Sequence, residues 1–150
     1  MYKRSAYDYV VIDVYARKKI PDARGGISYT VINSRGRMYE YLTLEQVTEM
    51  INGKTSISIF DLLEEMARVF NKNGLPASTT YMGNNLVIEI GGYVPFLVIF
   101  KPKTNMNVSE NELSLYLKSD ASRPIMSCKP NDYVTFTKNT IKTYKDMCHC

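Results

Sequence analysis

The residues of this sequence most typical of metal binding and nucleophilic catalysis lie at its end, in the stretch "YKDMCHC". His149 is the single histidine of the protein and stands between Cys148 and Cys150, while the third cysteine is Cys128. In an extended segment Cys148 and Cys150 point to one side and His149 to the other, so they do not readily converge on one ion. A structural zinc site also needs four ligands, usually in closely spaced pairs. We therefore expect no metal site and no cofactor here.

The sequence predicts a protein that is not an enzyme. A serine or cysteine nucleophile needs a histidine held by a third group on a rigid frame, whereas His149 stands where chains fray. The chain has no phosphate-binding loop, no dinucleotide-binding fingerprint and no G-x-S-x-G motif. Its odd number of cysteines, three, favours a reducing, intracellular setting.

One stretch resembles a metal-dependent nuclease. A predicted helix with Glu64 and Glu65 precedes the strands "NNLVIEI" and "VPFLVIFKPK", and this order resembles the core of PD-(D/E)xK-type nucleases. That family binds its metal through an acidic residue on one strand and an (Asp/Glu)-x-Lys triplet on the next, which would make Glu89 the first acid. The triplet at 99–101 reads Ile-Phe-Lys and has no carboxylate. The resemblance therefore implies an inactive relative.

Charge is distributed unevenly along the chain, although the formal net charge is only +4. Residues 1–40 carry eight Lys and Arg against four Asp and Glu, residues 41–100 carry three against six, and residues 101–150 carry eight against five. The basic residues concentrate in a loop at 17–24 and a hairpin tip at 35–37. A polarised surface follows if the basic flanks meet in space; ordinary solvation of loop tips is the alternative.

These basic residues, together with nearby tyrosines, predict one of two binding functions. The favoured one is a non-enzymatic protein-binding module of accessory, inhibitory or assembly type, because Tyr and Arg are frequent at interface hot spots. The alternative is a nucleic-acid-binding domain, in which tyrosines stack on bases and cations neutralise phosphates. The candidate binding residues are Arg17, Lys18, Lys19, Arg24, Arg35, Arg37, Tyr39 and Tyr41. Tyrosines packed against neighbouring strands are the simpler explanation.

Two weaker indications concern origin and fold relationship. Lys, Ile, Asn and Tyr make up 47 of the 150 residues, as in AT-rich genes, and suggest a phage or mobile element as the source. The helix–strand–strand–strand–helix order from 58 to 147 is similar to that of double-stranded-RNA-binding domains, with longer spacings. The longest apolar run, "YVPFLVIF", has eight residues, so no membrane-spanning segment is expected.

The first half of the chain must position the basic tip. Alternating apolar residues predict a strand at about 7–16 and a hairpin with strands near 27–33 and 37–43. A T-x-x-Q capping box predicts a short helix at about 44–52. The strongest pattern is that of a helix at about 58–73, where apolar residues recur at i, i+3, i+4, i+7, i+8 and i+11.

The second half is predicted to be mostly strands. Strands are expected near 78–82, 85–91 and 94–101, and "FLVIF" is expected in a central strand covered on both faces. "ELSLYLKS" and "YVTF" predict two more strands, "DASRPIMSCKPND" a loop, and "NTIKTYKDM" a short helix.

Together the elements predict one α+β domain over residues 1–150. Its antiparallel sheet of about six to eight strands, in one or two parts, packs against the helix at 58–73 and the shorter helix at 44–52. The expected core is Val10, Ile12, Val14, Ile59, Leu62, Leu63, Met66, Phe70, Val87, Leu97, Ile99 and Leu115.

Overall fold

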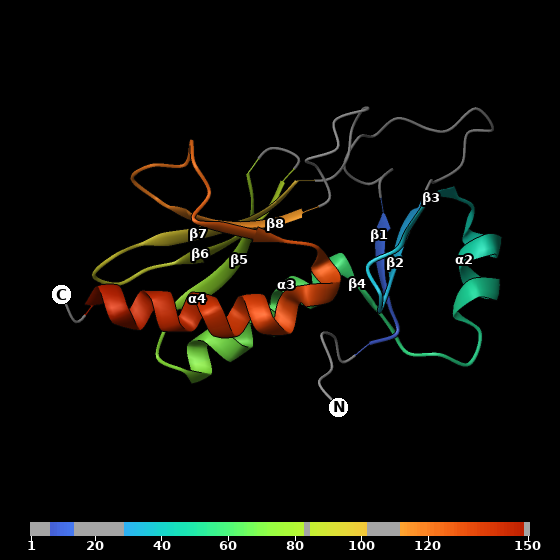
Figure 1. The fold of residues 1–150 in the computed structure, drawn as a ribbon, viewed down its shortest axis with the longest axis horizontal. Helices are drawn as coiled ribbons and strands as arrows, with labels where there is room; N and C mark the ends of the chain where they lie inside the picture. The colour runs from blue at the N-terminus through green and yellow to red at the C-terminus, as the bar shows by residue number, and fades with distance from the viewer. Residues whose placement is uncertain (1–6, 14–28, 83–84, 102–111, 149–150) are drawn as a thin grey trace.

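The computed structural model describes residues 7–13, 29–82, 85–101 and 112–148, in two β-sheets and a set of helices (Figure 1). In chain order the elements are β1 (Tyr9–Asp13), β2 (Tyr29–Asn33), β3 (Met38–Leu42), α2 (Leu44–Ile51), β4 (Ser56–Ser58), α3 (Ile59–Lys72), β5 (Ala77–Met82), β6 (Asn85–Ile90), β7 (Phe96–Lys101), β8 (Glu112–Leu117), β9 (Met126–Cys128), the 3-10 helix η1 (Pro130–Asp132) and α4 (Tyr133–Cys148). None of the helices in these ranges is long and apolar enough to cross a lipid bilayer.

The expected α+β fold is confirmed, with its sheet in two parts. The four-stranded sheet has the order β3-β2-β1-β4 and the five-stranded sheet the order β5-β6-β7-β8-β9. All pairs are antiparallel except β1 and β4, which run parallel. The pair β1–β4 is the exception to the expected antiparallel arrangement, and the β2–β3 hairpin and α2 together form the crossover connection that a parallel pair requires.

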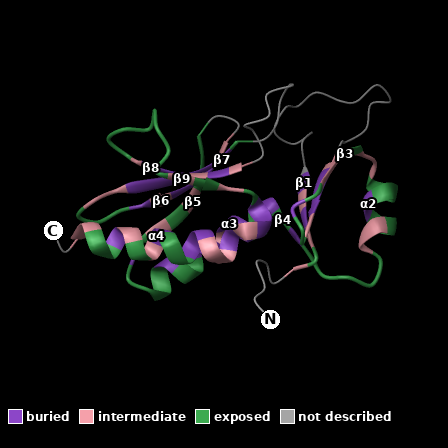
Figure 2. Ribbon diagram, in the orientation of Figure 1, coloured by how far each residue is buried: buried purple, intermediate pink, exposed green. Residues whose placement is uncertain are grey.

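Helix α3 packs against both sheets and forms the centre of the core. Ser58 Oγ accepts a hydrogen bond from the Asp61 N–H at 3.1 Å and caps the first turn, and Gly74 follows the helix with a φ of +88°. The buried face contains Ile59, Leu62, Leu63, Met66, Ala67 and Phe70. These side chains form one cluster with Val10 and Ile12 of the small sheet and Ile88 of the large one. Figure 2 shows buried positions in both sheets.

Strand β7 is the central strand of the large sheet, and its first five residues are buried, as its sequence predicted. Successive strand residues point to opposite faces, so the core residues divide into two groups. Val98 belongs to the main cluster beside α3, whereas Leu97 and Ile99 form a second cluster with Val87 and Tyr116 on the other face. Every expected core residue within the described ranges is buried; Val14 lies outside them.

The C-terminal region differs most from the sequence prediction. Helix α4 covers Tyr133–Cys148 and includes "YVTF", which was predicted to be a strand. The β-branched and aromatic residues suggested a strand, but Tyr133, Phe136 and Tyr144 also recur at helical spacing and are buried. Tertiary packing therefore overrides local propensity here. The short strands β9 and β4 were missed, because three residues show no periodicity.

The predictions for α2 and for the hairpin are confirmed within the described residues; positions 27–28 of the predicted hairpin and 14–16 of the predicted first strand lie outside them. Thr43 Oγ1 accepts from the Gln46 N–H at 3.2 Å and Gln46 Oε1 accepts from the Thr43 N–H at 2.9 Å, which completes the predicted capping box. Gly36 occupies the left-handed region with a φ of +85° at the β2–β3 turn.

Substitution of Gly92 tests how α4 is held against the large sheet. It has a φ of +103°, and a Cβ there would collide with the Tyr144 hydroxyl, which donates a hydrogen bond to the Gly91 carbonyl at 3.2 Å. We expect Gly92→Ala to lower the free energy of unfolding by about 2–4 kcal/mol, measured by urea denaturation. Gly74→Ala is the matched control, because its φ is also positive but nothing lies within 4 Å; it should cost only about 1 kcal/mol. Equal losses would contradict the role of Tyr144.

Candidate functional site

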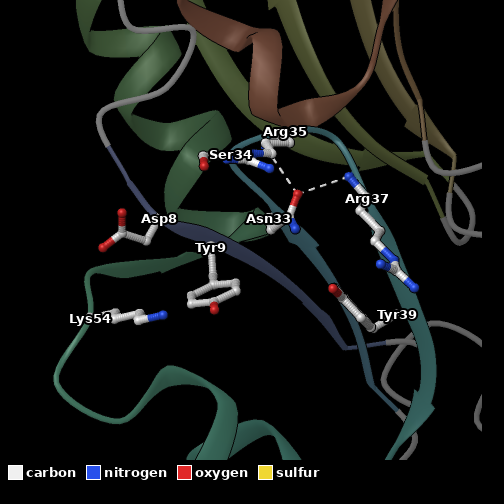
Figure 3. A pocket seen from close by; sticks show the side chains of 8 residues that line it. All are labelled: Asp8, Tyr9, Asn33, Ser34, Arg35, Arg37, Tyr39 and Lys54. Carbon is white, nitrogen blue, oxygen red and sulfur yellow. Dashed lines mark hydrogen bonds between the residues drawn. The ribbon is translucent and has the colours of Figure 1, made fainter.

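Arg35, Arg37 and Tyr39, three of the predicted binding residues, line one pocket on the small sheet (Figure 3). Its volume is about 540 Å³. The remaining lining residues are Asp8, Tyr9, Asn33, Ser34 and Lys54. We call this the tip pocket, because the turn of the β2–β3 hairpin forms one of its walls.

Asn33 shapes the turn that carries both arginines. Its side-chain oxygen Oδ1 accepts hydrogen bonds from the backbone N–H groups of Arg35 and Arg37, each at 2.9 Å (Figure 3). Its backbone N–H donates to the Arg37 carbonyl at 3.0 Å, and the Gly36 N–H donates to the Asn33 carbonyl at 2.9 Å. Because the backbone of the turn is held by these bonds, the Arg35 and Arg37 side chains start from a defined position while remaining exposed.

The hairpin tip also docks onto the segment before α4. Lys129 Nζ donates to the Gly36 carbonyl at 3.2 Å, and Asn131 Nδ2 donates to the Ser34 carbonyl at 3.4 Å. Asn131 is buried, and a Cβ at Gly36 would approach its Nδ2 to 3.4 Å. Residues about 95 positions apart in the chain thus meet at the tip, so the C-terminal region contributes to the shape of the pocket.

Two tyrosine rings face the pocket, and each lies beside a cation. Tyr9 of β1 pairs with Asn33, and Tyr39 of β3 pairs with Val31, so both side chains project from the same face of the sheet. The Arg37 guanidinium lies 5.2 Å from the centre of the Tyr39 ring, and Lys54 Nζ lies 5.7 Å from that of Tyr9. Figure 3 shows Lys54 pointing toward Tyr9. Both distances are within cation–π range.

The tip pocket is net positive. Its cations are Arg35, Arg37 and Lys54, and Asp8 is its acidic lining residue. Asp8 Oδ2 accepts hydrogen bonds from the N–H and the hydroxyl of Thr55, each at 3.2 Å. This carboxylate therefore fixes the segment leading into β4, and with it the neighbouring Lys54, against β1.

The other predicted binding residues do not join this site. Tyr41 is 70% exposed, has a φ of +59° and is absent from the pocket lining. The four basic residues Arg17, Lys18, Lys19 and Arg24 lie outside the described residues. In their place the structure adds Tyr9 and Lys54 to the site. Lys54 had no signal in the sequence, because only the parallel pairing of β4 with β1 brings it there.

The nuclease-like carboxylates are not brought together. Glu89 pairs with Leu97 on the face of the large sheet opposite α3, whereas Glu64 and Glu65 are on α3 itself. Glu65 accepts hydrogen bonds from the hydroxyls of Tyr7 at 3.0 Å and Tyr133 at 2.9 Å. Within the described ranges, no group of three His, Cys, Asp or Glu side chains could hold a metal ion. Glu64, Glu65 and Glu89 are therefore not arranged as the shared acidic site that the resemblance implies.

The cysteines that the structure describes have a packing role. Cys128 and Cys148 are free thiols, half-buried against the edge of the main core. Burial raises the pKa of the Cys128 thiol, and the nearby Asp132 carboxylate adds to this effect. A thiol that stays protonated is a weak nucleophile and a poor metal ligand. His149 and Cys150 lie outside the described residues.

Comparison with known proteins does not assign a family. No family model, curated protein or solved structure matches this chain. The function must therefore be inferred from the side chains themselves. What the tip pocket offers chemically is attraction for negative charge combined with two flat ring faces.

Asn33 provides a test of how the pocket is built. We expect Asn33→Ala to lower the free energy of unfolding by about 1–2 kcal/mol, because two backbone N–H groups lose their acceptor. The amide resonances of Arg35 and Arg37 should shift in NMR spectra. Ser34→Ala, at an exposed position of the same turn, is the control and should change stability by less than about 0.5 kcal/mol. An unperturbed turn in Asn33→Ala would contradict this assignment.

The contact between Tyr7 and Glu65 predicts a dependence of stability on alkaline pH. Hydrogen bonding to the Glu65 carboxylate raises the pKa of Tyr7 above its ordinary value. The resulting stabilisation is complete below the unfolded-state pKa of about 10 and is lost as pH rises through the higher folded-state value. Thermal denaturation from pH 8 to 11 should therefore show a shallower alkaline decline for Tyr7→Phe than for the wild type, with Tyr93→Phe, at an exposed ring, as the control. Identical declines in the wild type and Tyr7→Phe would contradict the contact.

Proposed function

We propose that this protein binds single-stranded nucleic acid in the tip pocket. The observation that carries the proposal is the placement of two tyrosine rings, Tyr9 and Tyr39, each beside a cation and both on one face of the small sheet. Arg35 adds a third positive charge at the rim.

The two kinds of side chain match the two parts of a nucleotide. Guanidinium groups bind phosphate oxygens through paired N–H donors, and Arg35 and Arg37 are both exposed for such contacts. Aromatic rings stack on bases whatever the base, because every base has a flat face. A positively charged surface with stacking rings is the usual design of proteins that bind single strands without strict sequence preference.

The spacing of the rings favours a short segment rather than a single base. Tyr9 and Tyr39 are on strands separated by β2 and are offset by two residues along it, so their backbones lie about 12 Å apart. Separate nucleotides of one extended strand are therefore suited to contact the two rings. In a duplex the bases are stacked on one another and their faces are unavailable to the tyrosines, so single strands are the better ligand.

The protein-binding module favoured by the sequence remains a prediction, and it would use the same residues. The carboxylates of an acidic protein segment could form ion pairs with Arg35, Arg37 and Lys54. Such a segment has no bases to stack on the rings of Tyr9 and Tyr39. The contribution of the rings therefore distinguishes the two functions.

Fluorescence anisotropy with a labelled oligothymidylate tests the proposal. Arg37→Ala should weaken binding and reduce the slope of log affinity against log salt by about one, because one phosphate contact is lost. Tyr39→Ala should weaken binding by about 5- to 150-fold while leaving that slope unchanged, because stacking is lost but no charge is removed.

Lys145→Ala is the matched control, since it removes one positive charge from the exposed side of α4, away from the pocket. It should retain near wild-type affinity. Equal weakening by Lys145→Ala and Arg37→Ala would contradict a specific site. Unchanged affinity of Tyr39→Ala, together with efficient competition by an acidic peptide, would favour an acidic protein segment as the ligand.

A further inference from the structure

Within the described residues the two sheets end in four edge strands, β3, β4, β5 and β9, which differ in how they are protected against pairing with another strand. Strands β4 and β9 have three residues each, and β3 contains the left-handed Tyr41 and a shift of register against β2. Short or irregular edge strands are common devices that prevent such pairing. β5 has neither feature: its six residues pair regularly with β6 over their whole length, and Ser78, Thr80, Tyr81 and Met82 are exposed.

The direction of the backbone groups in β5 follows from its register. The Gly91 N–H donates to the Pro76 carbonyl at 2.8 Å, so the pair Pro76–Gly91 is hydrogen-bonded. In an antiparallel ladder such pairs alternate, which makes Ser78 and Thr80 the next residues bonded to β6. The backbone N–H and C=O groups of Thr79 and Tyr81 therefore point to the open edge.

One end of this edge is already capped. The Asn71 side chain accepts from the Ala77 N–H at 3.0 Å and donates to the Ala77 carbonyl at 2.8 Å. This amide takes the place that an incoming strand would occupy at Ala77. Considering the described residues, the open part of the edge is thus the short window from Thr79 to Tyr81, and a partner strand has few registers available.

Apolar surface lies beside the open window. Tyr81 is 59% exposed and stacks on Phe60 of α3 with ring centres 6.3 Å apart, and the adjacent Met82 is 48% exposed. On the same side Thr79 Oγ1 donates to Glu64 at 3.5 Å. A strand added at this edge would therefore bury aromatic surface as well as form backbone hydrogen bonds.

We propose that the occupant of this edge is β5 of a second copy of the chain, paired antiparallel about a two-fold axis at Thr80. In that register Thr79 lies opposite Tyr81 of the second copy, and the reciprocal pair completes a ladder of four backbone hydrogen bonds. Thr80 lies opposite its own equivalent, as a two-fold interface requires.

The composition of β5 leaves its pairing with a second copy unopposed. β5 contains no Asp, Glu, Lys or Arg, so its pairing with itself brings no like charges opposite one another. The register places Thr80 across from Thr80, a pair that contributes favourably between strands, and Ser78 across from Met82. Edge strands are often protected from self-association by a charged residue, and β5 has none.

The dimer would join two five-stranded sheets into one continuous sheet. It does not depend on the proposed nucleic-acid function, since β5 and the tip pocket share no residues. If both hold, each dimer presents two tip pockets and gains affinity for long single strands through multivalency.

A charge-swap experiment at Thr80 tests the two-fold register. Sedimentation of the wild type at about 100 μM should show a dimer, since small interfaces of this kind give roughly micromolar affinity. Thr80→Lys and Thr80→Glu should each weaken dimerisation at least about tenfold, because like charges meet at the axis. An equimolar mixture of the two variants should recover the dimer, because the charges then become opposite.

Thr79→Pro is the second variant, and it removes an N–H that points to the open edge, so pairing with β6 is retained. Circular dichroism should show that this variant is folded, and sedimentation should show that it is a monomer. A wild type that stays monomeric at this concentration, charge variants that dimerise normally, or a mixture that fails to recover the dimer would each overturn the proposal. If Thr79→Pro does not fold, the charge swap decides the outcome alone.

Discussion

The burial of one face of α3 is the interaction on which the rest of this structure depends. Its six buried side chains contribute roughly 10 kcal/mol of hydrophobic free energy, and they contact residues of both sheets. On the face that carries Val10 and Ile12, the small sheet packs mainly against α3, whereas α2 contacts β2 and β3. The helix thus makes one core out of two sheets, and every surface feature is placed relative to it.

The tip pocket depends on this core through a chain of polar contacts. Asn131 and Lys129 reach the hairpin turn from the segment that leads into α4, and α4 is itself packed into the main cluster. Asn33 then holds the turn from within. The arginines are exposed, but the backbone that carries them is attached to buried structure on both sides. This is the usual arrangement of binding residues, which lie on loops held by a rigid scaffold.

Part of the candidate site could be predicted from sequence, and the reason lies in the range of the interactions involved. Arg35, Arg37 and Tyr39 are close in the chain, and a hairpin turn brings such neighbours together whatever the rest of the fold does. Tyr9 and Lys54 are 45 positions apart and meet only because β4 pairs in parallel with β1. A parallel pair leaves no local signature, since its crossover can have almost any sequence.

The sequence by itself determined the elements whose patterns are long or locally capped: α3, the β2–β3 hairpin, the capping box of α2 and the buried β7. Hydrophobic periodicity and cap chemistry act over one or two turns, so they can be read without knowing the fold. Only the tertiary structure decided that "YVTF" is helical, that Glu89 lies on the opposite face from Glu64, and that Lys54 reaches Tyr9. In each case the free energy comes from contacts between residues distant in the chain, which override weak local preferences and which no local pattern records.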